Sequence, residues 1–204
     1  PFESDPYNPA TRSGGYILGT DRQGRDVMSV MISGIPLTLQ IGLIAGLIGI
    51  TVGTFLAFIA AYYGGIVDNI ISTIVDVGLT IPGILILIVI AVNLQSGLTV
   101  PQMGLAVSAV AWVWPARTIR SQVLVMREQL YVEIARLSGT SGFSIMFKEM
   151  LPNLAPYIGA SLVGSVASAI LASVGLEALG LGPFDSPTLG MTIYWNIQFS
   201  SILH

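Results

Sequence analysis

Residues 37–62 read LTLQIGLIAGLIGITVGTFLAFIAAY, a stretch that contains no charged side chain. A membrane-spanning helix needs about 20 consecutive apolar residues, and this segment provides them. Over the whole chain of 204 residues, 53% are hydrophobic and only 9% are charged, whereas soluble domains carry about 25% charged residues. The sequence therefore predicts an all-α fold, a polytopic bundle of transmembrane helices.

Three further apolar stretches have the composition of a span: residues 69–93, 102–119 and 153–176. Residues 27–116 contain no Lys or Arg, as expected where a charge at the bilayer centre costs about 2.5 to 3.5 kcal/mol. The first span also carries glycines at spacings of three and four residues: Gly42, Gly46, Gly49 and Gly53. Small residues at this spacing predict close helix packing, with a gating hinge as the alternative.

The rarity of several residue types excludes whole classes of chemistry. The chain has no cysteine, and its single histidine is His204, so disulfides, thiol chemistry and a histidine-pair zinc site are excluded. Its single lysine, Lys148, follows Phe147, so a Gly-Lys-Ser/Thr phosphate-binding loop is excluded as well. We expect no catalytic residue, no metal and no cofactor in this chain, and any ATP must be hydrolysed on another subunit. The net charge of -3 gives no reason to expect nucleic acid.

The long segment between the third and fourth spans, residues 120–151, differs in charge from the rest of the chain. Five of the eight basic residues lie at or within it, namely Arg117, Arg120, Arg127, Arg136 and Lys148. The positive-inside rule predicts that this segment is cytoplasmic. Alternation then places residues 1–35, 94–101 and 180–204 on the extracellular side of the membrane and residues 63–68 on the cytoplasmic side.

Residues 131–139 within this cytoplasmic segment have the pattern of a short helix. Gly139 suits the left-handed position just after a helix end, and Ser141 is expected to cap a second helix that reaches Leu151. Pro152 is then expected to begin the fourth span. By their spacing, the residues on one face of the first helix are Tyr131, Ile134, Ala135 and Ser138. This arrangement favours docking into a partner's groove, with a helix lying on the lipid surface as the alternative.

The same residues resemble the EAA loop in permease subunits of bacterial and archaeal ABC importers. The matching positions are Glu133, Ala135, Gly139, Leu151 and Pro152. Three other segments resemble the dipeptide/oligopeptide-type permeases: GTDRQGRD at 19–26, YYGG at 62–65 and LGLG at 179–182. The resemblance covers nearly the whole chain, in order.

The resemblance implies a multi-pass subunit of the inner or plasma membrane with six spans, of which the first and last are expected outside the sequence given. It implies a second homologous permease chain as heterodimer partner, two ATP-binding subunits that hold ATP and Mg, and an extracellular substrate-binding protein. The expected cargo is an oligopeptide, with oligosaccharide or nickel uptake as the alternative. The residues expected to couple the chain to the ATPase are Glu133, Ala135, Arg136, Gly139, Leu151 and Pro152.

Candidates for the transport path are Asp76, Pro82, Asn93, Trp112 and Trp114. An ionisable residue inside a span is a functional candidate, and a proline kinks a helix. The alternatives are a structural hydrogen bond for the aspartate and interfacial anchoring for the tryptophans.

Residues 180–204 are expected to contact the binding protein or to line an outer gate, or alternatively to cap the bundle as a re-entrant or interfacial loop. The residues singled out there are Gly182, Pro187, Tyr194 and Trp195. Two other function classes stay open on the residues alone. They are a secondary transporter driven by an ion gradient, which needs ion ligands near the bilayer midplane, and a structural scaffold.

Overall fold

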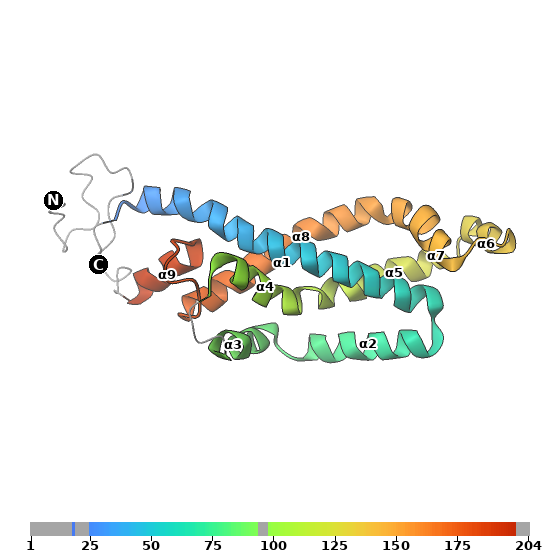
Figure 1. The fold of residues 1–204 in the computed structure, drawn as a ribbon, viewed down its shortest axis with the longest axis horizontal. Helices are drawn as coiled ribbons and strands as arrows, with labels where there is room; N and C mark the ends of the chain where they lie inside the picture. The colour runs from blue at the N-terminus through green and yellow to red at the C-terminus, as the bar shows by residue number, and fades with distance from the viewer. Residues whose placement is uncertain (1–17, 19–24, 94–97, 199–204) are drawn as a thin grey trace.

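The structure is a computed structural model that describes residue 18 and residues 25–93 and 98–198, and the elements in these ranges are all helical. The predicted all-α membrane fold is confirmed. Figure 1 shows an elongated bundle with α6 and α7 at one end and α9 at the other; we call these the α6 end and the α9 end. The elements are α1 (Val27–Tyr63), α2 (Gly65–Thr80), α3 (Gly83–Asn93), α4 (Val100–Ala111), α5 (Val113–Arg127), α6 (Leu130–Leu137), α7 (Gly142–Ser144), the π-helix η1 (Ile145–Met150), α8 (Leu151–Ala178) and α9 (Leu189–Gln198).

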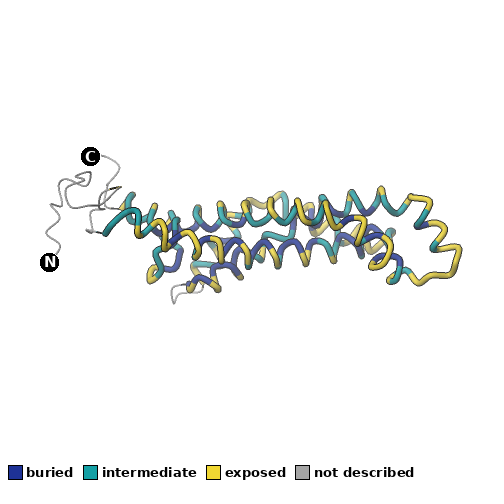
Figure 2. The backbone as a smooth tube through the Cα atoms, turned by 90° about the horizontal axis from the view of Figure 1, so that it is seen from above, coloured by how far each residue is buried: buried dark blue, intermediate teal, exposed yellow. Residues whose placement is uncertain are grey.

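The central element is α1, which packs against α4, α5 and α8 and is buried along its inner face (Figure 2). It begins at Val27, earlier than the span predicted from residue 37, because Asp26 caps it. The Asp26 carboxylate accepts hydrogen bonds from the N–H groups of Met28 and Ser29, both at 3.2 Å. Residues 27–35, which we expected to belong to the extracellular segment, are therefore part of the same helix.

The glycines of α1 are positions of close helix contact. A Cβ added at Gly46 would lie 2.6 Å from the side chain of Val166 on α8, and one at Gly53 would lie 2.8 Å from the carbonyl oxygen of Trp112. Contacts below 3.0 Å also surround Gly42 and Gly49. These distances support the packing interpretation of the glycine pattern, since a larger side chain at any of these positions would force neighbouring atoms to move.

The second and third predicted spans are not uninterrupted helices. Residues 69–93 form α2 and α3, which are bent by 83° at the intervening break. Ile81 has an extended backbone, because the ring of the following Pro82 disfavours helical geometry at the preceding residue. Residues 102–119 likewise extend over α4 and α5, with the break at Trp112. In the described ranges, two helices are long and apolar enough to cross a membrane alone, Val27–Tyr63 and Gly142–Ala178, and the bent pair would be a third crossing.

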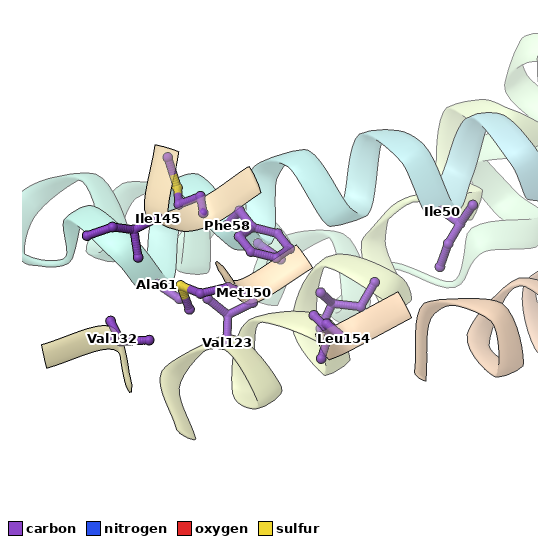
Figure 3. Close-up of a cluster of buried hydrophobic side chains, with 11 residues drawn as sticks. Ile50, Phe58, Ala61, Val123, Val132, Ile145, Met150 and Leu154 are labelled. Atoms are coloured by element: carbon purple, nitrogen blue, oxygen red, sulfur yellow. The ribbon is translucent and has the colours of Figure 1, made fainter. Parts of the chain in front are cut away.

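The α6 end has its own hydrophobic core, shown in Figure 3, which joins α1, α5, α6, η1 and α8. Its members include Phe58, Val123, Val132, Ile145 and Leu154. A second cluster toward the α9 end joins α1, α3, α4 and α8 around Ile41, Leu87, Met103 and Leu176. The α6 segment is therefore packed into the bundle and is not a detached loop.

Candidate functional site

The end of α6 is built around Gly139, which has a φ of 76°. The N–H of Thr140 donates to the carbonyl of Ala135 at 3.1 Å, and the N–H of Gly139 donates to the carbonyl of Arg136 at 3.0 Å. This pair of bonds is the Schellman motif, which satisfies the last carbonyls of a helix and reverses the chain. Gly139 thus occupies the left-handed position that its sequence context predicts.

One face of α6 packs inward and the other is an exposed apolar ridge. Val132 is fully buried in the α6-end core, and Tyr131 and Ala135 pack beside it. The outer face carries three large apolar side chains at helical spacing, which are 69%, 54% and 83% exposed: Leu130, Ile134 and Leu137. The four residues predicted to share one face are therefore divided, because Tyr131 and Ala135 pack inward beside Val132 whereas Ile134 and Ser138 are exposed. Glu133 and Arg136 are also exposed.

Tyr62, near the end of α1, connects α1 to both sides of the α6–α7 turn. The guanidinium carbon of Arg136 lies 5.3 Å from the centre of the Tyr62 ring, within the range of a cation–π interaction. On the other side, a Cβ added at Gly142 would lie 2.6 Å from Cε1 of the same ring. Tyr62 therefore provides direct contact between the end of α1 and the α6–α7 turn.

The connection from this turn to α8 is continuous. The side chain of Ser141 accepts a hydrogen bond from the N–H of Ser144 at 3.4 Å, as predicted for a cap. Beyond it, Gly142–Ala178 is a single helix, so a separate helix ending at Leu151 was the wrong prediction. Pro152 lacks an N–H and its ring crowds the preceding turn, and the helix adopts the π form of η1 just before it.

Besides Arg136, which lies over the Tyr62 ring, three of the five basic residues in this region form hydrogen bonds or ion pairs with α1 or α2. Arg120 forms a bidentate ion pair with Asp68, both bonds at 2.5 Å, and Arg127 donates to the carbonyl of Ala61 at 3.0 Å. Arg117 lies 3.1 Å from Asp76. Arg127 is thus a cation at the C-terminus of α1, where it stabilises the last carbonyls. The ion pairs of Arg117 and Arg120 join α5 to α2.

The predicted path residues do not converge on one site. The Asp76–Arg117 pair is 63% and 59% exposed, Pro82 lies at the α2–α3 break, and the side chain of Asn93 donates to the carbonyl of Val89 within α3. Trp112 packs against the cluster that joins α2 and α5.

Trp114 lines a cavity of about 350 Å³ between α4, α5 and α8. No charged side chain is among the residues that line this cavity. The hydroxyl groups in its wall belong to Thr118, Tyr157, Ser161, Ser165 and Ser168. The three serines on α8, Ser161, Ser165 and Ser168, lie at helical spacing, which is a signal visible in the sequence. The path prediction relied instead on the ionisable side chain of Asp76.

The residues singled out in the outer segment do lie together at the α9 end. Tyr194 and Trp195 pack at 5.0 Å between ring centres, and Phe184 contacts both rings. Gly182 packs against Glu177 and Met191, and the carbonyl of Pro187 approaches Gly34 of α1. Residues 199–204 lie outside the described part of the chain.

Glu177 and Thr188, both fully buried at this end, were not predicted from the sequence. Their signal is weak in sequence, since a single acid beyond the last apolar stretch resembles an ordinary end-of-span charge. Among the described residues, no three His, Asp or Glu side chains come close enough to hold a metal ion.

The fold and the site together define a polytopic helical bundle with a capped, amphipathic helix at one end. The chain belongs to the family of binding-protein-dependent transport system inner membrane components, whose family model matches residues 49–203. It is therefore an inner-membrane protein.

Three similar proteins are permease proteins of peptide-related systems. The chain is 32% identical to the glutathione transport system permease protein GsiD of Pectobacterium atrosepticum, over 89% of this chain and 59% of that protein. It is 32% identical to the oligopeptide transport system permease protein OppC of Lactococcus lactis subsp. cremoris, over 88% and 61%. It is 35% identical to the dipeptide transport system permease protein DppC of Haemophilus influenzae, over 89% and 62%. The chain thus spans about three fifths of the length of these curated relatives.

Proposed function

We propose that this chain is the permease subunit of an ATP-driven importer of small peptides, and that with a second homologous chain it encloses the transport path. The observation that carries the proposal is the exposed ridge of Leu130, Ile134 and Leu137 on a helix fixed at the tip of the bundle. An amphipathic helix that presents such anchors fits a groove on a partner protein. The names of the three relatives, which concern glutathione, oligopeptides and dipeptides, support a peptide cargo.

In this proposal the α6 end faces the cytoplasm, and α6 lies in a groove of one of two ATP-binding subunits that hold ATP and Mg. Closure of those subunits moves α6 as a rigid body. Tyr62 passes the motion to α1 through Arg136 and Gly142, and the helix through η1 passes it to α8. Glu133, Ala135, Gly139, Leu151 and Pro152 shape this lever, because they lie on α6, on its cap or at the start of α8.

The proposed path includes the cavity between α4, α5 and α8. Its serine hydroxyls and Trp114 offer hydrogen bonds and apolar contact without a fixed charge. Such a wall suits peptides of varied sequence, because the peptide backbone presents N–H and C=O groups whatever the side chains are. At the other end, the aromatic group of Phe184, Tyr194 and Trp195 would meet the substrate-binding protein.

The test is reconstitution in liposomes with the permease, ATPase and binding-protein products of neighbouring genes. A dipeptide, glutathione, an oligosaccharide and Ni²⁺ are supplied in turn, and uptake and ATP hydrolysis are measured. We expect peptide-stimulated hydrolysis and uptake that requires ATP. Uptake only of the oligosaccharide or Ni²⁺ would refute the peptide assignment, and uptake driven by an ion gradient without ATP would refute the importer itself.

A further inference from the structure

Glu177, in the last turn of α8, is a fully buried acidic side chain. Burial of a carboxyl group is costly unless hydrogen bonds compensate it. The hydrogen-bond partners of Glu177 therefore indicate what its burial achieves.

The carboxyl group of Glu177 binds the start of α9. Its Oε2 accepts a short hydrogen bond from the hydroxyl of Thr188 and a bond of 3.1 Å from the N–H of Met191. Thr188 is the residue before α9, and its hydroxyl oxygen also accepts from the N–H of Met191 at 3.2 Å. An acidic group at a helix N-terminus is favoured by the unpaired N–H groups and by the helix dipole. Glu177 thus caps α9 from a different helix.

The loop between α8 and α9 is shaped to enclose this group. A Cβ added at Gly190 would lie 2.4 Å from Oε2 of Glu177, and one at Gly182 would lie 2.6 Å from its Cγ. Only hydrogen atoms fit at these two positions. The second carboxyl oxygen, Oε1, is buried and has no hydrogen-bond partner in the described part of the chain.

The same loop also rests on α1. The hydroxyl oxygen of Thr38, itself buried, accepts a hydrogen bond from the N–H of Leu189 at 3.0 Å. A Cβ added at Gly34 would lie 2.4 Å from the carbonyl oxygen of Pro187. The start of α9 is therefore fixed to α1 on one side and to α8 on the other.

We propose that Glu177 is a positioning residue that fastens residues 179–188 and α9 across the ends of α1 and α8, and so fixes the surface that meets the substrate-binding protein. The positioning claim depends only on the contacts above. The claim about the binding protein rests on the proposed function.

The first readout is the mobility of a nitroxide at the exposed loop residue Asp185, placed by Asp185→Cys in a chain that has no cysteine of its own. In the assembled transporter in nanodiscs, Glu177→Ala should increase the mobility of this label. Glu177→Gln should leave it unchanged, because an amide oxygen accepts the same two hydrogen bonds. Thr188→Val, which removes one donor, should give an intermediate increase, and the exposed control Thr73→Val should give none.

The second readout is ATP hydrolysis as a function of binding-protein concentration. For Glu177→Ala we expect the half-saturating concentration to rise several-fold with basal hydrolysis unchanged, and we expect Glu177→Gln to restore the wild-type value. Equal label mobility in the Glu177→Ala, Glu177→Gln and wild-type proteins would overturn the positioning role. If Glu177→Ala does not fold, wild-type label mobility in Thr188→Val would overturn it instead. Increased mobility with an unchanged half-saturating concentration would overturn the link to the binding protein. If the proposed function is wrong, the binding protein will not stimulate ATP hydrolysis even in the wild type. The label mobility would still test the positioning role of Glu177 in that case.

Discussion

Replacement of Gly139 by asparagine, alanine and valine separates backbone strain from crowding at the end of α6. The φ of Gly139 is 76°, and a Cβ there would meet no atom within 4 Å. Any cost must therefore come from the left-handed backbone, which is about 1 to 2 kcal/mol for an ordinary residue and smaller for asparagine. A β-branched residue should reach the upper part of the range of about 1 to 3 kcal/mol for such strain.

The free-energy cost of the strained backbone sets the change in affinity that a binding assay must detect. A change of 1 to 2 kcal/mol alters a two-state population about 5- to 30-fold. If the partner ATPase binds α6 only with its Schellman end intact, the affinity for the purified ATP-binding subunit should fall in the order Gly, Asn, Ala, Val. Binding is measured by titration of the labelled ATPase with the permease in nanodiscs, and gel filtration checks that each variant is inserted and monodisperse.

The matched control is the same series at Gly65, which has a φ of 55° and equally open space at the Cβ position. Gly65 lies at the same end of the bundle, as the first residue of α2. A loss that follows side-chain volume, with asparagine worse than alanine, would refute the strain argument. An equal loss of ATPase affinity in the Gly65 series would refute the specific role of α6.

Three further outcomes follow from the packing and the ion pairs. Gly53→Leu should destabilise the bundle by more than the roughly 1 to 3 kcal/mol of moderate overpacking, because main-chain atoms lie within 3 Å of the added carbon. Gly159→Ala, where a Cβ would meet nothing within 4 Å, should be neutral or stabilising. Thermal unfolding measures both variants. Arg120→Gln should lower the unfolding temperature in detergent clearly, because it breaks a half-buried bidentate pair with Asp68, and equal melting of the variant and the wild type would contradict this. Asp76→Asn removes one partner of the ion pair with Arg117 and should keep full peptide uptake; loss of uptake in a stable protein would support Asp76 as a path residue.

Local sequence signals predicted much of the α6 end. Gly139, Ser141 and the helix between the third and fourth apolar stretches are recognisable because cap chemistry acts over a few residues. The glycine spacing of α1 also indicated close packing, because a helix face is defined by sequence separation alone.

The features that the sequence did not reveal depend on contacts between distant segments. Pro82 predicted a kink, but it did not predict the 83° angle between α2 and α3 or the packing of α3 against α4 and α8. The pairing of Arg120 with Asp68 joins residues far apart in the chain, and neither charge identifies its partner. Glu177 was missed for the same reason, since its burial depends on Thr188 and on a loop that folds back over it.

The most direct test of the central claim is disulfide cross-linking between α6 and the ATP-binding subunit. Single cysteines are placed at the exposed Leu137, at the buried Val132 and at the exposed Ile193 on α9, and each is paired with cysteines that line the ATPase surface. We predict a cross-link from position 137 whose yield changes when ATP is bound, and none from positions 132 or 193. Active transporter with no cross-link from position 137, or with one from position 193 instead, would contradict it.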